Sequence, residues 1–101
     1  MPMEARAWSN GSGTFGIHVG IANRDLHFDR TWNEIEVEID GRPHRFRLTR
    51  GFWNQCPEFR DSGGTAIRDW LRRHHTLTWP RRRPPRFQLL PLGEGRFRLV
   101  G

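Results

Sequence analysis

The sequence contains no lysine, and all seventeen of its basic residues are arginine. The planar guanidinium group of arginine binds phosphate or carboxylate through two parallel hydrogen bonds and stacks on aromatic rings, which the compact ammonium group of lysine does less well. A surface that served solubility alone would be expected to mix the two residues. Because a GC-rich genome also replaces lysine codons with arginine codons, the bias suggests a binding surface without proving one.

Cysteine and long apolar runs are also scarce. The single cysteine, Cys56, cannot form a disulfide within the chain, which fits a reducing compartment and predicts a cytoplasmic location. No apolar run approaches the roughly 18 residues that span a bilayer, and residues 1–13 lack the apolar block of a secretory signal. The arginines do not lie on an amphipathic helix with a broad apolar face, so we expect no membrane partner.

Size and charge narrow the class of protein. With 101 residues and an apolar content of 35%, the chain suffices for one domain with one modest core. Its formal net charge of +6 points to a polyanionic partner, because a positive potential raises the local concentration of nucleic acid.

Residues 9–13 read Ser-Asn-Gly-Ser-Gly, a composition typical of flexible segments, and residues 1–13 show no apolar period. The sequence therefore predicts a flexible N-terminal arm over residues 1–13 and a single basic α+β domain over residues 14–101. Apolar and polar side chains alternate over residues 14–21, which predicts a strand, and residues 26–28 can supply a short second one. Gly16 inside the first strand indicates a bend or the close approach of another backbone or a ligand.

Residues 33–48 carry the clearest strand signal. Ile35, Val37 and Ile39 alternate with glutamates, and Asp40-Gly41 is a dipeptide favoured in type I′ hairpin turns. The register that follows pairs Ile35 with Phe46, Val37 with His44, Glu36 with Arg45, and Glu34 with Arg47. Because opposite charges across a ladder contribute roughly 0.2–1 kcal/mol per pair, the arginines of this hairpin are predicted to be structural ion-pair partners.

Two short helices are predicted after this hairpin. Thr49 can cap a helix over residues 50–56, which Pro57 ends. Thr65 can cap a second helix, whose buried stripe at helical spacing consists of Ile67, Trp70, Leu71 and His74. The outer face of this second helix carries arginines, Arg68 and Arg72 among them.

The last hairpin, over residues 86–99, is predicted to carry unpaired arginines. A three-residue loop ending at Gly95 would place Leu89 opposite Phe97. The outer face then holds Arg86, Arg96 and Arg98 with no acidic residue. It adjoins Arg81-Arg82-Arg83, a segment that the two following prolines are expected to hold extended. Like charges on one face repel, so an anionic partner or good solvent screening must offset them.

The predicted fold class is α+β: a small twisted or barrel-like antiparallel β-sheet with two short helices inserted between hairpins. One contiguous core is expected from the buried positions of these elements. They are Ile35, Val37, Ile39, Phe46, Leu48, Phe52, Ile67, Trp70, Leu71, Phe87, Leu89, Phe97 and Leu99.

The contrast between the two hairpins favours a small nucleic-acid-binding domain, with DNA preferred to RNA. A basic sheet that carries nucleic acid in the manner of oligonucleotide-binding barrels fits the strand count. Phosphate contacts are expected from Arg81, Arg82, Arg83, Arg86, Arg96 and Arg98, with Arg68 and Arg72 as secondary candidates. A helix-turn-helix reading, with Arg68, Arg72 and His75 at base edges, fits less well because Pro57 and the Gly63-Gly64 linker interrupt it.

Two other functions stay open at the level of sequence. The chain can be an interaction module, or a subunit of a larger assembly, whose arginines bind an acidic protein surface. It can also be a metal-independent nuclease in which His18, His27 or His75 acts with a nearby arginine on a phosphodiester, although catalysis is the less favoured reading.

No cofactor or metal site is expected. The five histidines and one cysteine lack the ligand spacing of structural zinc sites. Cys56, between Trp53 and Phe59, is predicted to be a buried and inert thiol rather than a nucleophile.

Overall fold

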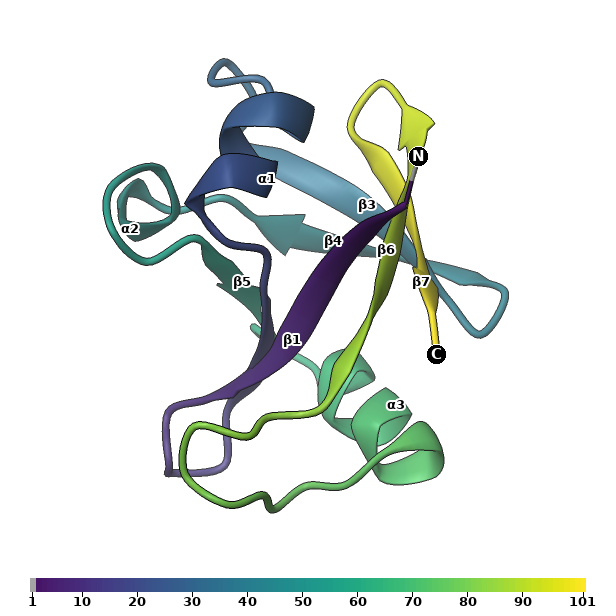
Figure 1. Ribbon diagram of the computed structural model, residues 1–101. Coiled ribbons are helices and arrows are strands. Elements are labelled where there is room, and N and C mark those ends of the chain that lie inside the picture. The colour runs from purple at the N-terminus through teal and green to yellow at the C-terminus, as the bar shows by residue number, and fades with distance from the viewer. Residues whose placement is uncertain (1) are drawn as a thin grey trace.

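The computed structural model describes residues 2–101 and shows a twisted, nearly closed sheet of seven strands with three short helices (Figure 1). The strands are β1 (Met3–Ser9), β2 (Phe15–His18), β3 (Glu34–Ile39), β4 (Arg42–Arg47), β5 (Glu58–Arg60), β6 (Arg86–Gly93) and β7 (Arg96–Val100). The helices are α1 (Ile21–His27), α2 (Arg50–Trp53) and α3 (Ala66–His74). The predicted α+β class and barrel-like sheet are confirmed.

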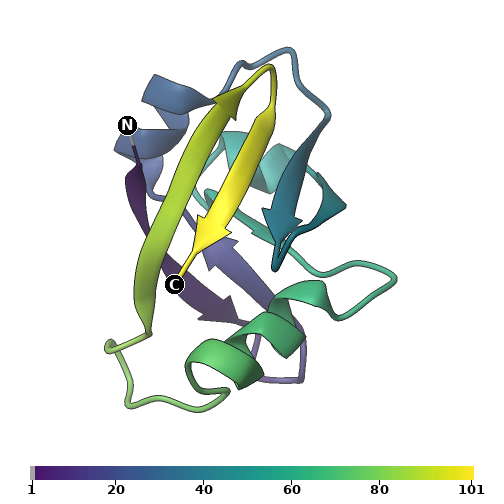
Figure 2. The same ribbon diagram turned by 90° about the vertical axis from the view of Figure 1, so that its right-hand side faces the viewer.

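The strand order in the sheet is β4-β3-β7-β6-β1-β2-β5. Every neighbouring pair is antiparallel, as predicted, except β3 and β7, which run parallel and join the two hairpins into one sheet. The rings of Phe46 on β4 and Phe59 on β5 lie 5.2 Å apart, so the two edge strands approach each other inside the barrel. Helix α3 covers one end of the sheet, below β6 and β7 in Figure 2.

The flexible arm predicted over residues 1–13 is wrong for residues 3–9, which form β1. This strand pairs with β6 on one side and β2 on the other, and its inward side chains Met3, Ala5 and Ala7 are buried. Two of these side chains are alanine, whose small apolar surface gives a weak periodic signal. One of the two partners of β1, strand β6, also lies at the far end of the chain, where no local pattern can reveal it.

Helix α1 replaces the short strand predicted over residues 26–28. Its anchor is Arg24, which is 4% exposed and whose Nη1 donates hydrogen bonds to the carbonyl oxygens of Phe52, at 2.9 Å, and Asn54, at 2.8 Å. This contact ties α1 to the turn after α2. It explains why local residue preferences did not reveal the helix.

The first hairpin, β3–β4, has the predicted register in full, from Glu34 opposite Arg47 to Val37 opposite His44. Asp40 and Gly41 have φ values of 51° and 82°, as a type I′ turn requires. The predicted ion pair differs: Arg45 Nη1 lies 3.0 Å from Glu34 Oε2, on the diagonal neighbour rather than on Glu36.

The last hairpin, β6–β7, pairs Leu89 with Leu99 rather than with Phe97. The observed register differs from the predicted one by two residues, and the ladder has an irregularity between Pro91 and Gly93. A shift of two residues keeps every side chain on its predicted face. All thirteen predicted core residues are therefore buried, and they belong to one apolar cluster with β1, β2 and β5.

Helix α3 is capped by Asp61 rather than by the predicted Thr65. The backbone N–H groups of Ile67 and Arg68 donate to Asp61 Oδ1 at 2.9 Å and to Oδ2 at 3.1 Å. The Thr65 hydroxyl instead donates to the carboxylate of Asp69 at 2.9 Å and makes no cap bond. Burial raises the pKa of Asp61, and the two N–H donors oppose that rise by favouring the charged form.

Replacing Asp61 by alanine should lower the free energy of unfolding by about 1–2 kcal/mol, because two N–H groups at the start of α3 lose their acceptor. Thr65→Ala should cost no more than about 0.5 kcal/mol. Urea denaturation of both variants measures the difference. Equal losses in the two variants would contradict the assignment of the cap to Asp61 in favour of Thr65.

Candidate functional site

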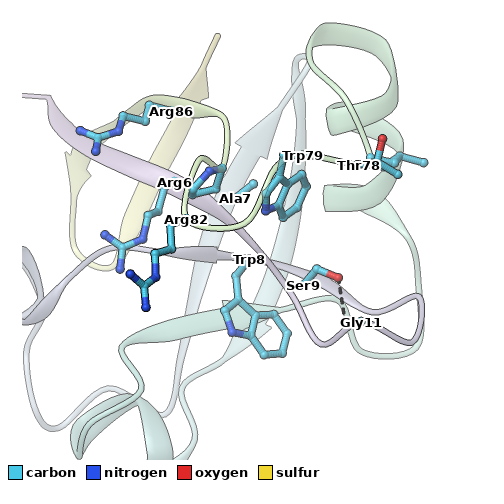
Figure 3. A pocket seen from close by; sticks show the side chains of 11 residues that line it. Arg6, Ala7, Trp8, Ser9, Gly11, Thr78, Trp79, Arg82 and Arg86 are labelled. Carbon is cyan, nitrogen blue, oxygen red and sulfur yellow. Dashed lines mark hydrogen bonds between the residues drawn. The ribbon is translucent and has the colours of Figure 1, made fainter.

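A groove of about 660 Å³ lies between β1 and the long loop that connects α3 to β6 (Figure 3). The lining residues come from two segments that are distant in sequence. They are Arg6, Ala7, Trp8, Ser9 and Gly11 from β1 and its turn; Leu77, Thr78, Trp79, Arg82 and Pro84 from the loop; and Arg86 at the start of β6. The N–H of Ala7 donates to the carbonyl oxygen of Pro85 at 3.0 Å and fastens the loop to β1.

The sheet register builds one wall of this groove. Along β1 the alanines face the core, so Arg6 and Trp8 project outward on the same side of the strand. Arg6 lies opposite His18 on β2 and opposite Arg86 on β6. These three side chains also line a smaller adjoining cavity of about 40 Å³.

Three arginines of the groove reach out on one side of it, as Figure 3 shows for Arg6, Arg82 and Arg86. Arg86 forms an ion pair with Glu4: Nη1 of Arg86 donates a hydrogen bond to Oε1 of Glu4 at 3.1 Å. Within residues 2–101, Arg6 and Arg82 have no carboxylate within ion-pair distance. The groove therefore carries positive charge that the chain itself does not neutralise.

Trp8 also contacts an arginine that does not line the groove. The guanidinium carbon of Arg60 on β5 is 4.5 Å from the centroid of the Trp8 ring. Gly16 on β2 sits between them in the register, opposite both. A Cβ atom at this glycine would lie 2.5 Å from the carbonyl oxygen of Phe59, so the predicted close approach of another backbone at Gly16 is confirmed.

The segment with three consecutive arginines is a turn and not the extended stretch that the prolines predicted. The N–H of Arg83 donates to the carbonyl oxygen of Pro80 at 2.9 Å, and Arg82 has a φ of 67°. Arg82 lines the groove, whereas Arg81 and Arg83 are exposed on the loop outside its lining. The turn thus brings one of the three predicted contacts into the site.

The arginines of the last hairpin are not free of acidic neighbours, so that expectation is wrong. Arg98 Nε lies 2.6 Å from Glu38 Oε2, and Arg96 lies opposite Glu36 in the parallel pairing of β3 with β7. Sequence alone could not foresee this, because it did not indicate that β3 would flank β7. The secondary candidates Arg68 and Arg72 lie on α3, outside the groove lining.

Among the three histidines proposed for catalysis, His18 lies closest to the groove arginines in the sheet register. Its Nδ1 is buried and has no hydrogen-bond partner within residues 2–101. Burial lowers the pKa of His18, and the positive charge of Arg6 lowers it further, so both favour the neutral imidazole. His75 instead packs against the rings of both Trp70 and Phe87.

Glu58 lies opposite His18 on β5 and is 6% exposed. Burial raises its pKa, while the positive charge of Arg60 opposes the rise. So deep a carboxyl group is poorly placed to contact a ligand. Its contact with Arg60 Nη2, at 3.5 Å, helps to hold that guanidinium beside Trp8.

Three further observations concern the chemistry of the described residues. Cys56 is exposed, so the prediction of a buried thiol is wrong. Within residues 2–101, no three side chains of histidine, cysteine, aspartate or glutamate gather where they could hold a metal ion. Over the same residues, no helix is long and apolar enough to cross a membrane.

Comparison of the chain with protein-family models, with curated proteins and with solved structures finds no match in any of the three.

Proposed function

We propose that this chain is a nucleic-acid-binding domain whose phosphate contacts come from Arg6, Arg82 and Arg86 in the groove. The observation that carries the proposal is the unneutralised charge of Arg6 and Arg82 beside two tryptophan rings in one hollow. Backbone phosphates bind arginine strongly, and aromatic rings offer stacking surfaces to bases. The formal net charge of +6 adds a long-range attraction that steers a polyanion toward the protein.

The lining of the groove favours nucleic acid over an acidic protein surface. An acidic protein surface presents carboxylates to arginine but few flat groups that would stack on the aromatic rings. A nucleic acid strand presents phosphates and flat bases at a regular interval, which matches guanidinium groups next to indoles. DNA is the first ligand to test, and RNA differs from it at the 2′-hydroxyl group.

The backbone of Arg82 gives independent support. Its φ of 67° is in the left-handed region, which costs an L-residue with a side chain roughly 1–2 kcal/mol and which glycine adopts freely. Strained residues of this kind concentrate at functional sites, where the side chain serves a purpose that a relaxed residue would not. Arg82 places its guanidinium in the groove at this cost.

Replacing Arg82 by glycine should therefore leave the protein as stable as its parent or more stable by up to about 1 kcal/mol. The same change should weaken nucleic-acid binding by about fivefold or more, because one phosphate contact is lost. Arg81→Gly is the matched control, since it removes the same charge from the neighbouring residue outside the groove lining. Thermal melting and fluorescence anisotropy measure the two effects, and equal affinity losses would contradict a special role for Arg82.

The proposal itself is tested by titrating labelled DNA single strands, DNA duplex and RNA with the intact chain over a series of salt concentrations. Binding should weaken linearly in a plot of log affinity against log salt. The slope should be near −0.7 per phosphate contact for single strands and −0.9 for duplex. No binding to any of the three at low salt would overturn the proposal and make the acidic protein surface the better candidate.

A further inference from the structure

Trp8 differs from the other four tryptophans in its relation to the core. Trp70 is buried in the apolar cluster, and Trp32, Trp53 and Trp79 pack against that cluster. Among the described residues, Trp8 is the one tryptophan outside it, and it is half-buried on the outer face of β1. Its large apolar ring therefore contributes little to the folding of this domain.

Trp8 contacts an arginine and also lines the groove. The guanidinium of Arg60 lies over the ring at 4.5 Å, and Arg60 does not belong to the groove lining, whereas Trp8 does. Arg60 in turn contacts Glu58 at 3.5 Å, so both the ring and its cation have partners within the fold.

We infer that the groove selects single-stranded nucleic acid, with one unpaired base stacked on the Trp8 ring where it lines the groove. The flanking phosphates then bind Arg6, two residues earlier on the same face of β1, and Arg82 of the loop, whose side chain extends on the same side of the groove as that of Arg6 (Figure 3). This inference rests on the proposed function and adds the class of strand that the site takes.

A duplex is a poor ligand for such a platform. Each base in a duplex is covered on both faces by its neighbours, so stacking on Trp8 requires that a base first be unpaired and unstacked. A single strand supplies an exposed base without that cost. The volume of the groove, about 660 Å³, lies within the range of ~300–1,000 Å³ typical of sites that enclose small ligands, which suits a few nucleotides.

The test compares Trp8→Ala with the parent on a DNA single strand and on a duplex of the same sequence. Binding to the single strand should weaken by about 5- to 150-fold, the range measured for the loss of one base–aromatic stack. Binding to the duplex should change less than about twofold. Trp8→Phe, which keeps an aromatic face, should recover most of the single-strand affinity.

Trp53→Ala is the matched control. Trp53 also lies beside an arginine, with the guanidinium carbon of Arg30 5.3 Å from its ring, but it does not line the groove. This variant should bind both ligands as the parent does, with circular dichroism confirming that each variant is folded.

Equal losses on single strand and duplex would overturn the single-strand inference and leave the proposed function standing. An unchanged single-strand affinity in Trp8→Ala would overturn the stacking on Trp8. A parent protein that binds neither ligand would overturn the proposed function together with this inference.

Discussion

Replacing Trp70 by alanine is expected to lower the free energy of unfolding by about 3–5 kcal/mol, a large part of the 5–15 kcal/mol typical of a whole domain. Trp70 is 2% exposed, and its ring meets that of Phe87 edge-on at 4.9 Å. This contact joins α3 to β6, so the alanine variant leaves a cavity between the helix and the strand. Urea denaturation followed by circular dichroism measures the loss.

Trp8→Ala is the control for this change, because it removes an identical side chain from outside the core. It should cost less than about 1 kcal/mol. A Trp70→Ala protein that keeps the denaturation midpoint of its parent would show that α3 does not depend on this contact with the sheet.

The first hairpin could be predicted residue by residue because its signals are local. Asp40-Gly41 selects the turn, and the turn together with strict alternation allows one register. The last hairpin was predicted with the right faces and a register two residues off, because alternation reveals neither the length of the turn nor the irregularity between Pro91 and Gly93. Local patterns thus determine which face a side chain occupies more securely than they determine its partner.

The strands that flank each hairpin in the sheet could not be predicted from the sequence, and these strands determine which side chains form the groove. The parallel pairing of β3 with β7 places Glu38 beside Arg98, which neutralises a side chain expected to bind. The insertion of β1 beside β6 places Arg6 and Trp8 at the groove, although both were assigned to a flexible arm. Long-range strand order carries no short-range sequence signal.

A signal for β1 is nevertheless present in the sequence. Inward Met3, Ala5 and Ala7 alternate with outward Glu4, Arg6 and Trp8, which is the period of a strand with one buried face. The adjacent run of serine and glycine, which is typical of flexible segments, favoured the prediction of a flexible arm over that of a strand. Of the predicted phosphate contacts, Arg82 and Arg86 line the groove; of the residues that the sequence missed, Arg6 and Trp8 complete it.

Replacing Arg6, Arg82 and Arg86 together by alanine is expected to weaken binding to a DNA single strand by about 100-fold at low salt. Three charge-assisted contacts of roughly 1 kcal/mol each account for that loss. The slope of log affinity against log salt should also become shallower by about two units, since each lost phosphate contact on a single strand removes about 0.7. Anisotropy titrations at several salt concentrations measure both quantities.

The control for this variant removes the same number of charges from elsewhere on the surface. Arg45, Arg73 and Arg98 each pair with a carboxylate, and none of them lines the groove. Replacing these three by alanine lowers the formal net charge from +6 to +3, as the groove variant does. Long-range attraction therefore falls by a similar amount in both, and the difference between them isolates direct contact.

The two triple variants separate general attraction from a site. If the control variant keeps a steep salt slope and most of its affinity, phosphates bind in the groove. If both variants lose affinity and slope equally, net charge alone drives binding, and the groove between β1 and the loop is not the site. Because both variants lower the formal net charge by the same three units, a greater loss in the groove variant comes from the position of its arginines.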